Sequence, residues 1–309
     1  MALVIIRNDD KTDRWIEAFR KADPSLIVYD YHKPHPRETV RMAAVWKHPA
    51  GSLSQYPNLR AVHGLGAGVD FILEDPGLKP DWPVLRVTDP FLAADMAEYI
   101  LAQVLAYLRQ LPEYYADKAR HTWNPRPYRR IGDVTIGLMG LGTLGTAAAR
   151  LLSDCGFSCC GWTRGSHPEV AFPVYRGAGG MKDFLASCQV LVCLLPLTPE
   201  TRGILNRETF GALPRGAYVI NVARGPLLVE NDLLESLQSG ELSGACLDVF
   251  AEEPLPAGHP FWKHPGIQMT PHIASVSEPA SVVPQIIANY RAFLKGGELR
   301  NEVSRQRGY

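Results

Sequence analysis

The sequence predicts an α/β protein built from two doubly wound parallel-sheet domains. Short apolar strands alternate with helical stretches over residues 1–89, and the alternation restarts at residue 134. The 309 residues also exceed what a single compact core usually holds. We therefore expect a first domain over 1–98, a second over 99–278, and a C-terminal segment, 279–309, whose helix returns to the first domain.

The elements of the first domain follow from the spacing of its apolar residues. The alternation predicts a helix over 13–23 and strands over 3–6, 25–31, 43–47, 59–66 and 84–89. A segment with helical periodicity follows over 93–119, where Pro112 is expected to kink or break the helix. This segment is predicted to connect the two domains.

The second domain begins with a buried strand over 134–139 and continues as strands and helices to about residue 275. The stretch 278–298 then has the pattern of a helix that can pack on the first domain. One domain is thus predicted to be inserted within the other.

Composition excludes several classes of function. The chain has 32 basic and 32 acidic residues, which gives no basic excess for nucleic acid or an anionic membrane. No apolar run approaches the ~18–20 residues of a membrane span, and the N-terminus has the pattern of a strand instead of a signal peptide. The six cysteines lack CxxC and zinc-ligand spacing, so we expect free thiols in a reducing cytoplasm and no metal site.

A glycine-rich turn directly follows the strand over 134–139 and opens a helix. Gly140 allows the tight turn, Gly142 lets the backbone approach a pyrophosphate, and Gly145 lets the helix pack closely on the sheet. The helix N-terminus, at Thr143 and Leu144, would supply amide groups and the helix dipole to the phosphates. The alternative is a turn of the same kind that binds no ligand.

Cofactor choice is expected at the end of the next strand, where NAD-binding proteins usually carry an acidic residue. This chain has Thr163 and Arg164 there, with Ser166 as a further donor. Arg164 offers a charged planar fork suited to a 2′-phosphate, and Thr163 removes the repelling carboxylate. We predict NADPH/NADP as cofactor, with NADH weaker; a solvated surface arginine is the alternative.

Three later strands finish on residues with complementary chemistry: Arg224, Glu253 and His272. Ligands of parallel sheets gather at the carboxyl ends of strands. Arg224 can bind the carboxylate of a 2-oxo acid and polarise its carbonyl, His272 can donate a proton to the forming alkoxide, and Glu253 can keep that histidine charged and oriented. Each residue taken singly can also have a purely structural role.

These residues belong to five motifs along the chain: GLGTLG, LPLTPET, NVARG, LDVFAEEPLP and TPHIA. With these motifs, the sequence resembles the D-isomer-specific 2-hydroxyacid dehydrogenase family over nearly the whole chain. The resemblance implies a Rossmann dinucleotide-binding domain inserted in a flavodoxin-like substrate domain, with Arg224, Glu253 and His272 as the catalytic residues. It implies further cofactor-binding residues at Leu195, Pro196, Thr201, Ala223 and Asp248. It also implies a substrate site formed by Arg224, His272, Trp46, Gly66, Ala67, Gly68 and Val69.

Two positions can be interpreted only by comparison with the family pattern. Many relatives have a histidine where this chain has Tyr99, so that position receives no catalytic role. In the pair Glu252-Glu253, the family places its acid immediately before the proline, which selects Glu253. For Trp46 a core position, and for the turn 66–68 a structural role, remain alternatives.

The resemblance also sets expectations for substrate and assembly. GLGAGVD, WTR and the closing RGY resemble the branch of the family that reduces glyoxylate and hydroxypyruvate. A homodimer is expected, with contacts from the helix after residue 93 and the loop 123–128. The alternatives are a dehydrogenase of the same family with other 2-oxo acids as substrates, and a non-catalytic protein that senses dinucleotides.

Overall fold

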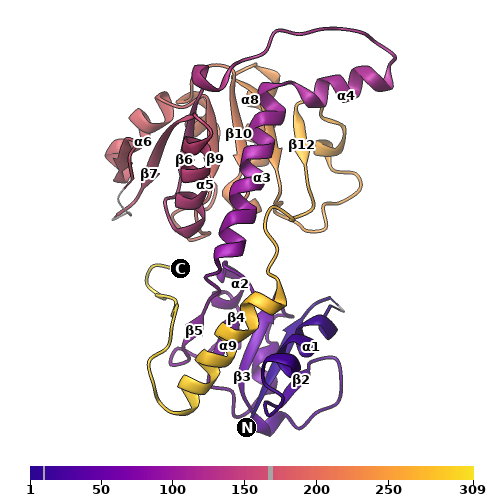
Figure 1. Ribbon diagram of the computed structural model, residues 1–309, viewed down its shortest axis with the longest axis vertical. Coiled ribbons are helices and arrows are strands. Elements are labelled where there is room, and N and C mark those ends of the chain that lie inside the picture. Colours follow the sequence, from indigo (N-terminus) through magenta and orange to yellow (C-terminus); the bar gives the residue numbers. More distant parts are fainter. Residues whose placement is uncertain (10, 166–169) are drawn as a thin grey trace. The chain divides into compact units, whose positions relative to one another are not determined.

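The computed structural model describes residues 1–9, 11–165 and 170–309. The chain forms two compact units: unit 1 combines Met1–Phe91 with Val276–Tyr309, and unit 2 is the continuous segment Leu92–Ser275 (Figure 1). These limits lie a few residues before those expected from the sequence, 98/99 and 278/279. The first limit falls inside one continuous helix, where the hydrophobic pattern gives no sign of a boundary.

Unit 1 contains a five-stranded sheet in the order β2-β1-β3-β4-β5, in which all pairs are parallel. This is the flavodoxin-like order, as the family resemblance implies. The strands are β1 (Ala2–Arg7), β2 (Val28–Asp30), β3 (Val40–Trp46), β4 (Ala61–Gly64) and β5 (Val84–Leu85). The helices are α1 (Asp13–Ala22), α2 (Asp70–Leu73) and α9 (Pro279–Leu294), with short 3-10 turns η1 (Arg37–Thr39) and η2 (Ser52–Gln55).

A buried polar contact joins the C-terminal segment to the sheet of unit 1. Helix α9 packs beside α1, and Asn289 on α9 donates from Nδ2 to Nε2 of His63 on β4, at 3.1 Å. The other ring nitrogen, Nδ1, donates to the Gly64 carbonyl at 2.7 Å. Burial lowers the pKa of His63 to about 4, so the ring is neutral at pH 7, as one donor and one acceptor require.

Unit 2 contains a seven-stranded parallel sheet in the order β12-β11-β10-β9-β6-β7-β8. The strand order reverses between β6 and β9, which is the switch point of a Rossmann sheet. The strands are β6 (Thr135–Met139), β7 (Ser158–Thr163), β8 (Val174–Arg176), β9 (Val190–Cys193), β10 (Ala217–Asn221), β11 (Leu242–Leu247) and β12 (Ile267–Met269). Together the two sheets confirm the predicted fold class.

Helices cover both faces of the sheet in unit 2. One apolar core joins α3 (Pro90–Leu108) and α5 (Thr143–Asp154) to one face, where Figure 1 draws both helices across the strands. The opposite core contains side chains from α6 (Gly177–Ala186), α7 (Arg207–Gly211) and α8 (Glu230–Gln238). The remaining elements are α4 (Leu111–Ala119) and the 3-10 turns η3 (Ile131–Asp133), η4 (Gly225–Leu227) and η5 (Pro260–Lys263).

The segment predicted as one long helix with a break is two helices, α3 and α4. The break lies at Gln110, whose φ of 53° is left-handed, and Pro112 stands in the first turn of α4, where its missing amide hydrogen is tolerated. Contrary to expectation, α3 is long and apolar enough to cross a membrane by length and composition. Its buried side chains, including Ile100 and Val104, belong to the core of unit 2.

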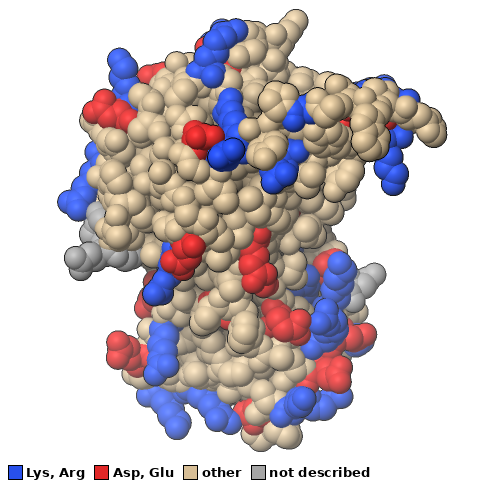
Figure 2. All heavy atoms as spheres, turned by 45° about the horizontal axis from the view of Figure 1, so that its top comes forward, with Lys and Arg blue, Asp and Glu red and all other residues tan. Residues whose placement is uncertain are grey.

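Basic and acidic residues are interspersed over the face drawn in Figure 2.

Candidate active site

The glycine-rich turn lies between β6 and α5, at the carboxyl edge of the sheet in unit 2. Gly140 has a φ of 113°, and a Cβ there would lie 3.0 Å from the Leu194 carbonyl. A Cβ on Gly145 would lie 1.9 Å from the Gly140 oxygen, so only glycine permits this approach of helix to strand. A Cβ on Gly142 would meet no atom within 4 Å. Open space at Gly142 beside the N-terminus of α5, with Thr143 and Leu144 in its first turn, fits a pyrophosphate.

Thr163 ends β7, the strand beside β6, so Thr163 and Arg164 stand at the same edge as the glycine-rich turn. The Arg164 side chain is about half exposed, and its Nη1 lies 3.9 Å from Oε2 of Glu200. Glu200 belongs to the LPLTPET motif, but its position beside Arg164 was not predicted, because the two residues lie in loops that follow different strands. Ser166 lies outside the described residues.

The LPLTPET segment follows β9 and is closed by Thr201. The Thr201 hydroxyl donates to the Pro196 carbonyl at 2.7 Å and accepts from the Thr198 amide at 2.8 Å. Leu195 is buried in the adjoining core. Since β9 lies between β6 and β10, this loop stands between the glycine-rich turn and the turn that carries Arg224.

Arg224 lies in a turn after β10 that Asn221 organises. Asn221 is fully buried; its Nδ2 donates to the Arg224 carbonyl at 3.0 Å, and its Oδ1 accepts from the Ala223 amide at 3.2 Å. A Cβ on Gly225 would lie 1.9 Å from the carbonyl carbon of Phe250. The glycine thus lets the turn of Arg224 touch the loop that follows β11.

Glu253 and His272 form a direct pair. His272 Nδ1 lies 2.9 Å from Oε2 of Glu253, and Oε1 of the same carboxylate accepts from the Phe250 amide at 3.0 Å. Both side chains are about one-fifth exposed. The carboxylate thus holds the ring through Nδ1, which is the arrangement of a histidine acid oriented by a carboxylate.

Asp248 folds the loop that carries His272. Its carboxylate accepts from the Thr270 hydroxyl at 2.6 Å and from the amides of Ile273 and Ala274 at 2.8 and 2.9 Å. Its carbonyl accepts from the His272 amide at 2.8 Å. His272 itself has a φ of 56°, a left-handed conformation that non-glycine residues rarely adopt. Asp248 was predicted to bind the cofactor, and in the structure its hydrogen bonds organise the loop of His272.

The predicted substrate residues of unit 1 lie at the ends of β3 and β4. The Trp46 ring covers Gly66 so closely that a Cβ there would lie 2.6 Å from Cζ3 of the tryptophan. Phe71 packs edge-on against the same ring, with centroids 5.5 Å apart. Ala67 and Gly68 are half-buried, and Val69 is buried at the start of α2. Trp46 thus rests on the turn 66–69.

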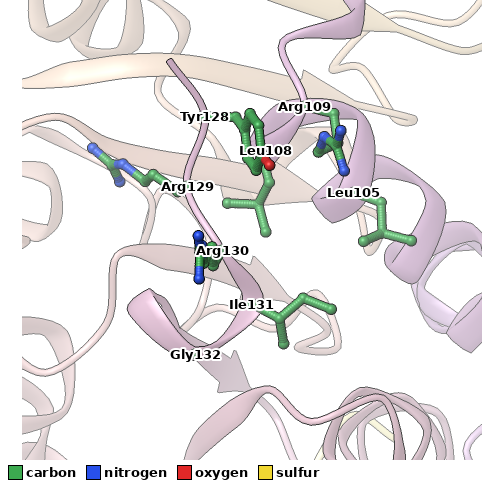
Figure 3. A pocket seen from close by; sticks show the side chains of 8 residues that line it. All are labelled: Leu105, Leu108, Arg109, Tyr128, Arg129, Arg130, Ile131 and Gly132. Carbon is green, nitrogen blue, oxygen red and sulfur yellow. The ribbon is translucent and has the colours of Figure 1, made fainter.

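A cavity of about 380 Å³ lies elsewhere in unit 2, where the end of α3 meets the segment before β6 (Figure 3). The Arg109 guanidinium stacks on the Tyr128 ring at 4.3 Å from its centroid. None of the predicted site residues lines this cavity, whose walls are Leu105, Leu108, Arg109, Tyr128, Arg129, Arg130, Ile131 and Gly132.

A parallel sheet with this strand order and a glycine-rich turn at its switch point defines a dinucleotide-binding domain of the Rossmann class. Comparison with known proteins specifies the class further. Residues 101–274 match the family described as D-isomer specific 2-hydroxyacid dehydrogenase, NAD binding domain. The chain belongs to this family, as the sequence motifs indicated.

Several solved structures resemble the whole chain. A D-isomer specific 2-hydroxyacid dehydrogenase from Xanthobacter autotrophicus, in complex with NADPH and MES, is 40% identical over 100% of this chain and 99% of its own, with a TM-score of 0.93. An NADPH-dependent glyoxylate/hydroxypyruvate reductase from Sinorhizobium meliloti, in complex with NADP and sulfate, is 36% identical over 100% and 99%, with a TM-score of 0.92. A probable 2-hydroxyacid dehydrogenase from Rhizobium etli, with NADP, HEPES and tartaric acid, is 32% identical over 100% of both chains, with a TM-score of 0.89.

Proposed function

We propose that the protein reduces small 2-oxo acids, such as glyoxylate and hydroxypyruvate, to 2-hydroxy acids with NADPH. The observation that carries this proposal is the His272–Glu253 pair, 2.9 Å apart, at the carboxyl ends of β12 and β11, beside the turn of Arg224 after β10. These strands adjoin one another in a sheet that also carries a dinucleotide turn. The similarity to a glyoxylate/hydroxypyruvate reductase supports the choice of substrate.

In this proposal the chain's own residues bind, orient and protonate the substrate. Arg224 binds the substrate carboxylate and stabilises the negative charge that develops on the carbonyl oxygen. His272 donates the proton from Nε2 to that oxygen, and Glu253 holds the ring through Nδ1. The bound nicotinamide supplies the hydride. Addition of hydride to carbon and of the proton to oxygen converts the C=O group to a secondary alcohol or, with glyoxylate, a primary one.

Unit 1 is proposed to bind the substrate carboxylate through backbone amides of the turn 66–69. Ala67 and Gly68 are half-buried and small, which favours access to the amide groups of this turn, as anion-binding turns require, whereas Gly66 lies beneath the Trp46 ring. The Trp46 ring resting on Gly66 would limit the length of the acid. This limit favours two- and three-carbon substrates.

The preference for NADPH is proposed to reside in Arg164. The arginine can bind the 2′-phosphate, while Glu200, 3.9 Å away, brings a negative charge close to the same position. The Thr198 hydroxyl donates to Glu200 and lowers the pKa of its carboxyl group below the ordinary value, so the charge is present at pH 7. The two side chains should therefore have opposite effects on NADPH affinity.

Replacing Arg164 by alanine is expected to weaken NADPH binding by about 10–100-fold, the effect of losing a hydrogen bond to a charged group, and to leave NADH binding nearly unchanged. Glu200→Gln should tighten NADPH binding and leave NADH unaffected. Titration of each variant with both nucleotides by fluorescence measures the dissociation constants. Arg150→Ala, which removes an exposed arginine from α5, is the control for loss of charge. Equal losses for NADPH and NADH in Arg164→Ala would contradict the assigned phosphate contact.

The proposed activity is tested by mixing the protein with glyoxylate or hydroxypyruvate and following oxidation of NADPH and NADH in parallel. We expect rapid oxidation with a clear preference for NADPH. Turnover with NADH alone would preserve the enzyme class and refute the role of Arg164. Tight NADPH binding without turnover on any small 2-oxo acid would favour a dinucleotide-sensing protein instead.

A homodimer is also proposed, with contacts from α3, α4 and the loop 123–128. Large hydrophobic side chains are exposed here: Trp123 is 97% exposed, and Tyr115 and Tyr128 are more than half exposed. Exposed aromatic residues of this kind are typical of protein interfaces. Light scattering should give twice the 34.1 kDa of one chain, and Trp123→Asp should shift the mass towards the monomer. A wild-type mass of one chain would refute the dimer.

A further inference from the structure

Tyr99 lies on α3 and reaches the loop of His272 through its hydroxyl. Its Oη lies 2.5 Å from Oγ1 of Thr270, which directly follows the strand β12 and lies two residues before His272. The contact joins residues 171 positions apart in the sequence. The sequence analysis gives Tyr99 no catalytic role because many relatives have a histidine there, and its contact with Thr270 can be recognised only in the folded chain.

The direction of the hydrogen bonds follows from the proton count. The Thr270 hydroxyl has one proton and donates it to Oδ1 of Asp248 at 2.6 Å. Thr270 can therefore only accept from Tyr99, so the chain runs from the Tyr99 hydroxyl through Thr270 to the Asp248 carboxylate. Burial raises the pKa of Tyr99 well above its ordinary value, which keeps the hydroxyl protonated as this direction requires.

Asp248 connects these hydrogen bonds to the backbone on both sides of His272. The amides of Ile273 and Ala274, on the far side of the histidine, donate to the same carboxylate, and the His272 amide donates to the Asp248 carbonyl. The loop 270–274 is thus closed around Asp248, which is 1% exposed. This closure holds His272 at its left-handed φ of 56°. A change in the orientation of the Asp248 carboxylate would shift the backbone on both sides of the histidine.

We propose that Tyr99 is a positioning residue for His272, acting through Thr270 and Asp248; this inference rests on the proposed function of His272 as proton donor. Without the Tyr99 hydroxyl, the Thr270 oxygen loses its donor in a largely buried site, and the series of hydrogen bonds is no longer held by α3. The Nε2 atom of His272 then samples orientations away from the substrate oxygen. Misplacement of a reacting group lowers the rate without a comparable loss of cofactor binding.

The same helix provides a matched control. The Tyr107 hydroxyl lies 3.0 Å from Oγ of Ser243 on β11, and its ring stacks on Tyr218. Tyr107→Phe therefore removes a tyrosine hydroxyl that joins α3 to the same sheet, where its partners among the described residues are Ser243 and the Gly216 carbonyl instead of the loop of His272. Any effect of Tyr99→Phe that Tyr107→Phe shares belongs to the packing of α3.

The kinetic test compares these two variants with the wild type. We expect Tyr99→Phe to lower kcat for glyoxylate by about tenfold and to leave the Kd of NADPH unchanged, while Tyr107→Phe stays within twofold of the wild type in both. Thr270→Val should have the same effect as Tyr99→Phe, and the double variant should be no slower than Thr270→Val, since both act in one chain. A kcat for Tyr99→Phe within twofold of the wild type, an equal loss in Tyr107→Phe, or additive effects would overturn the inference.

A second readout does not depend on turnover. In protein labelled at histidine, the ring signals of His272 are identified by their loss in His272→Asn. We expect these signals to shift in Tyr99→Phe and not in Tyr107→Phe, while those of His259, paired with Glu230 in the same unit, stay in place. If the wild type did not turn over any 2-oxo acid, the proposed function would be refuted. The shift of the His272 ring signals in Tyr99→Phe would then still test whether Tyr99 positions His272. An unchanged His272 spectrum in Tyr99→Phe would overturn it.

Discussion

Replacing His272 by asparagine is expected to lower kcat for glyoxylate reduction by about 10²–10⁴-fold, the contribution of a positioned general acid. Asparagine occupies similar space and has no titratable group to donate. The Kd of NADPH should change little, because three strands separate β12 from β6, which precedes the glycine-rich turn. Steady-state oxidation of NADPH and a fluorescence titration of the same preparation measure the two quantities.

Unit 2 contains a second histidine–glutamate pair that serves as the control. His259 Nε2 lies 3.1 Å from Oε2 of Glu230, and this pair is as shielded from solvent as the pair of His272 and Glu253. His259→Asn removes the same chemistry at the N-cap of η5. We expect it to retain the wild-type kcat. A His272→Asn variant with full activity, or equal losses in both variants, would refute the assignment of the proton donor.

The strand ends and the glycine-rich turn could be predicted from the sequence because their signals are local. Gly140, Gly142 and Gly145 stand at fixed intervals after a buried strand, and the structure gives each a physical reason: a positive φ, open space and close packing. Arg224, Glu253 and His272 lie three, six and three residues after the ends of three apolar strands, β10, β11 and β12. In a parallel sheet, such positions meet at one edge.

The parts of the site that could not be predicted depend on contacts between distant residues. Asn221 and Gly225 shape the turn of Arg224, but the need for glycine comes from the Phe250 backbone, 25 residues further on. The Tyr99–Thr270 contact spans 171 residues. Nothing in the local pattern around these residues indicates a partner. The limit at Phe91 falls within α3 for the same reason, since helical periodicity continues across it.

Replacing Arg224 by lysine is expected to lower kcat/KM for glyoxylate by about 10²–10³-fold, the effect of removing a donor to the developing charge. Lysine keeps the positive charge and loses the planar fork that binds a carboxylate through two parallel bonds. Both KM and kcat should therefore change, whereas His272→Asn should act on kcat alone. Initial rates over a range of glyoxylate concentrations, at saturating NADPH, separate the two parameters.

Arg207→Lys is the control, because Arg207 forms an exposed ion pair with Glu235 on the surface of unit 2, and the variant should behave as the wild type. Asn221 holds the Arg224 backbone carbonyl in both the wild type and the variant, while the guanidinium donates from Nη1 to the Ala223 carbonyl at 2.7 Å. Any change in kinetics then reports the side chain. An unchanged KM would contradict carboxylate binding by Arg224, and an unchanged kcat would contradict its role in stabilising the carbonyl oxygen.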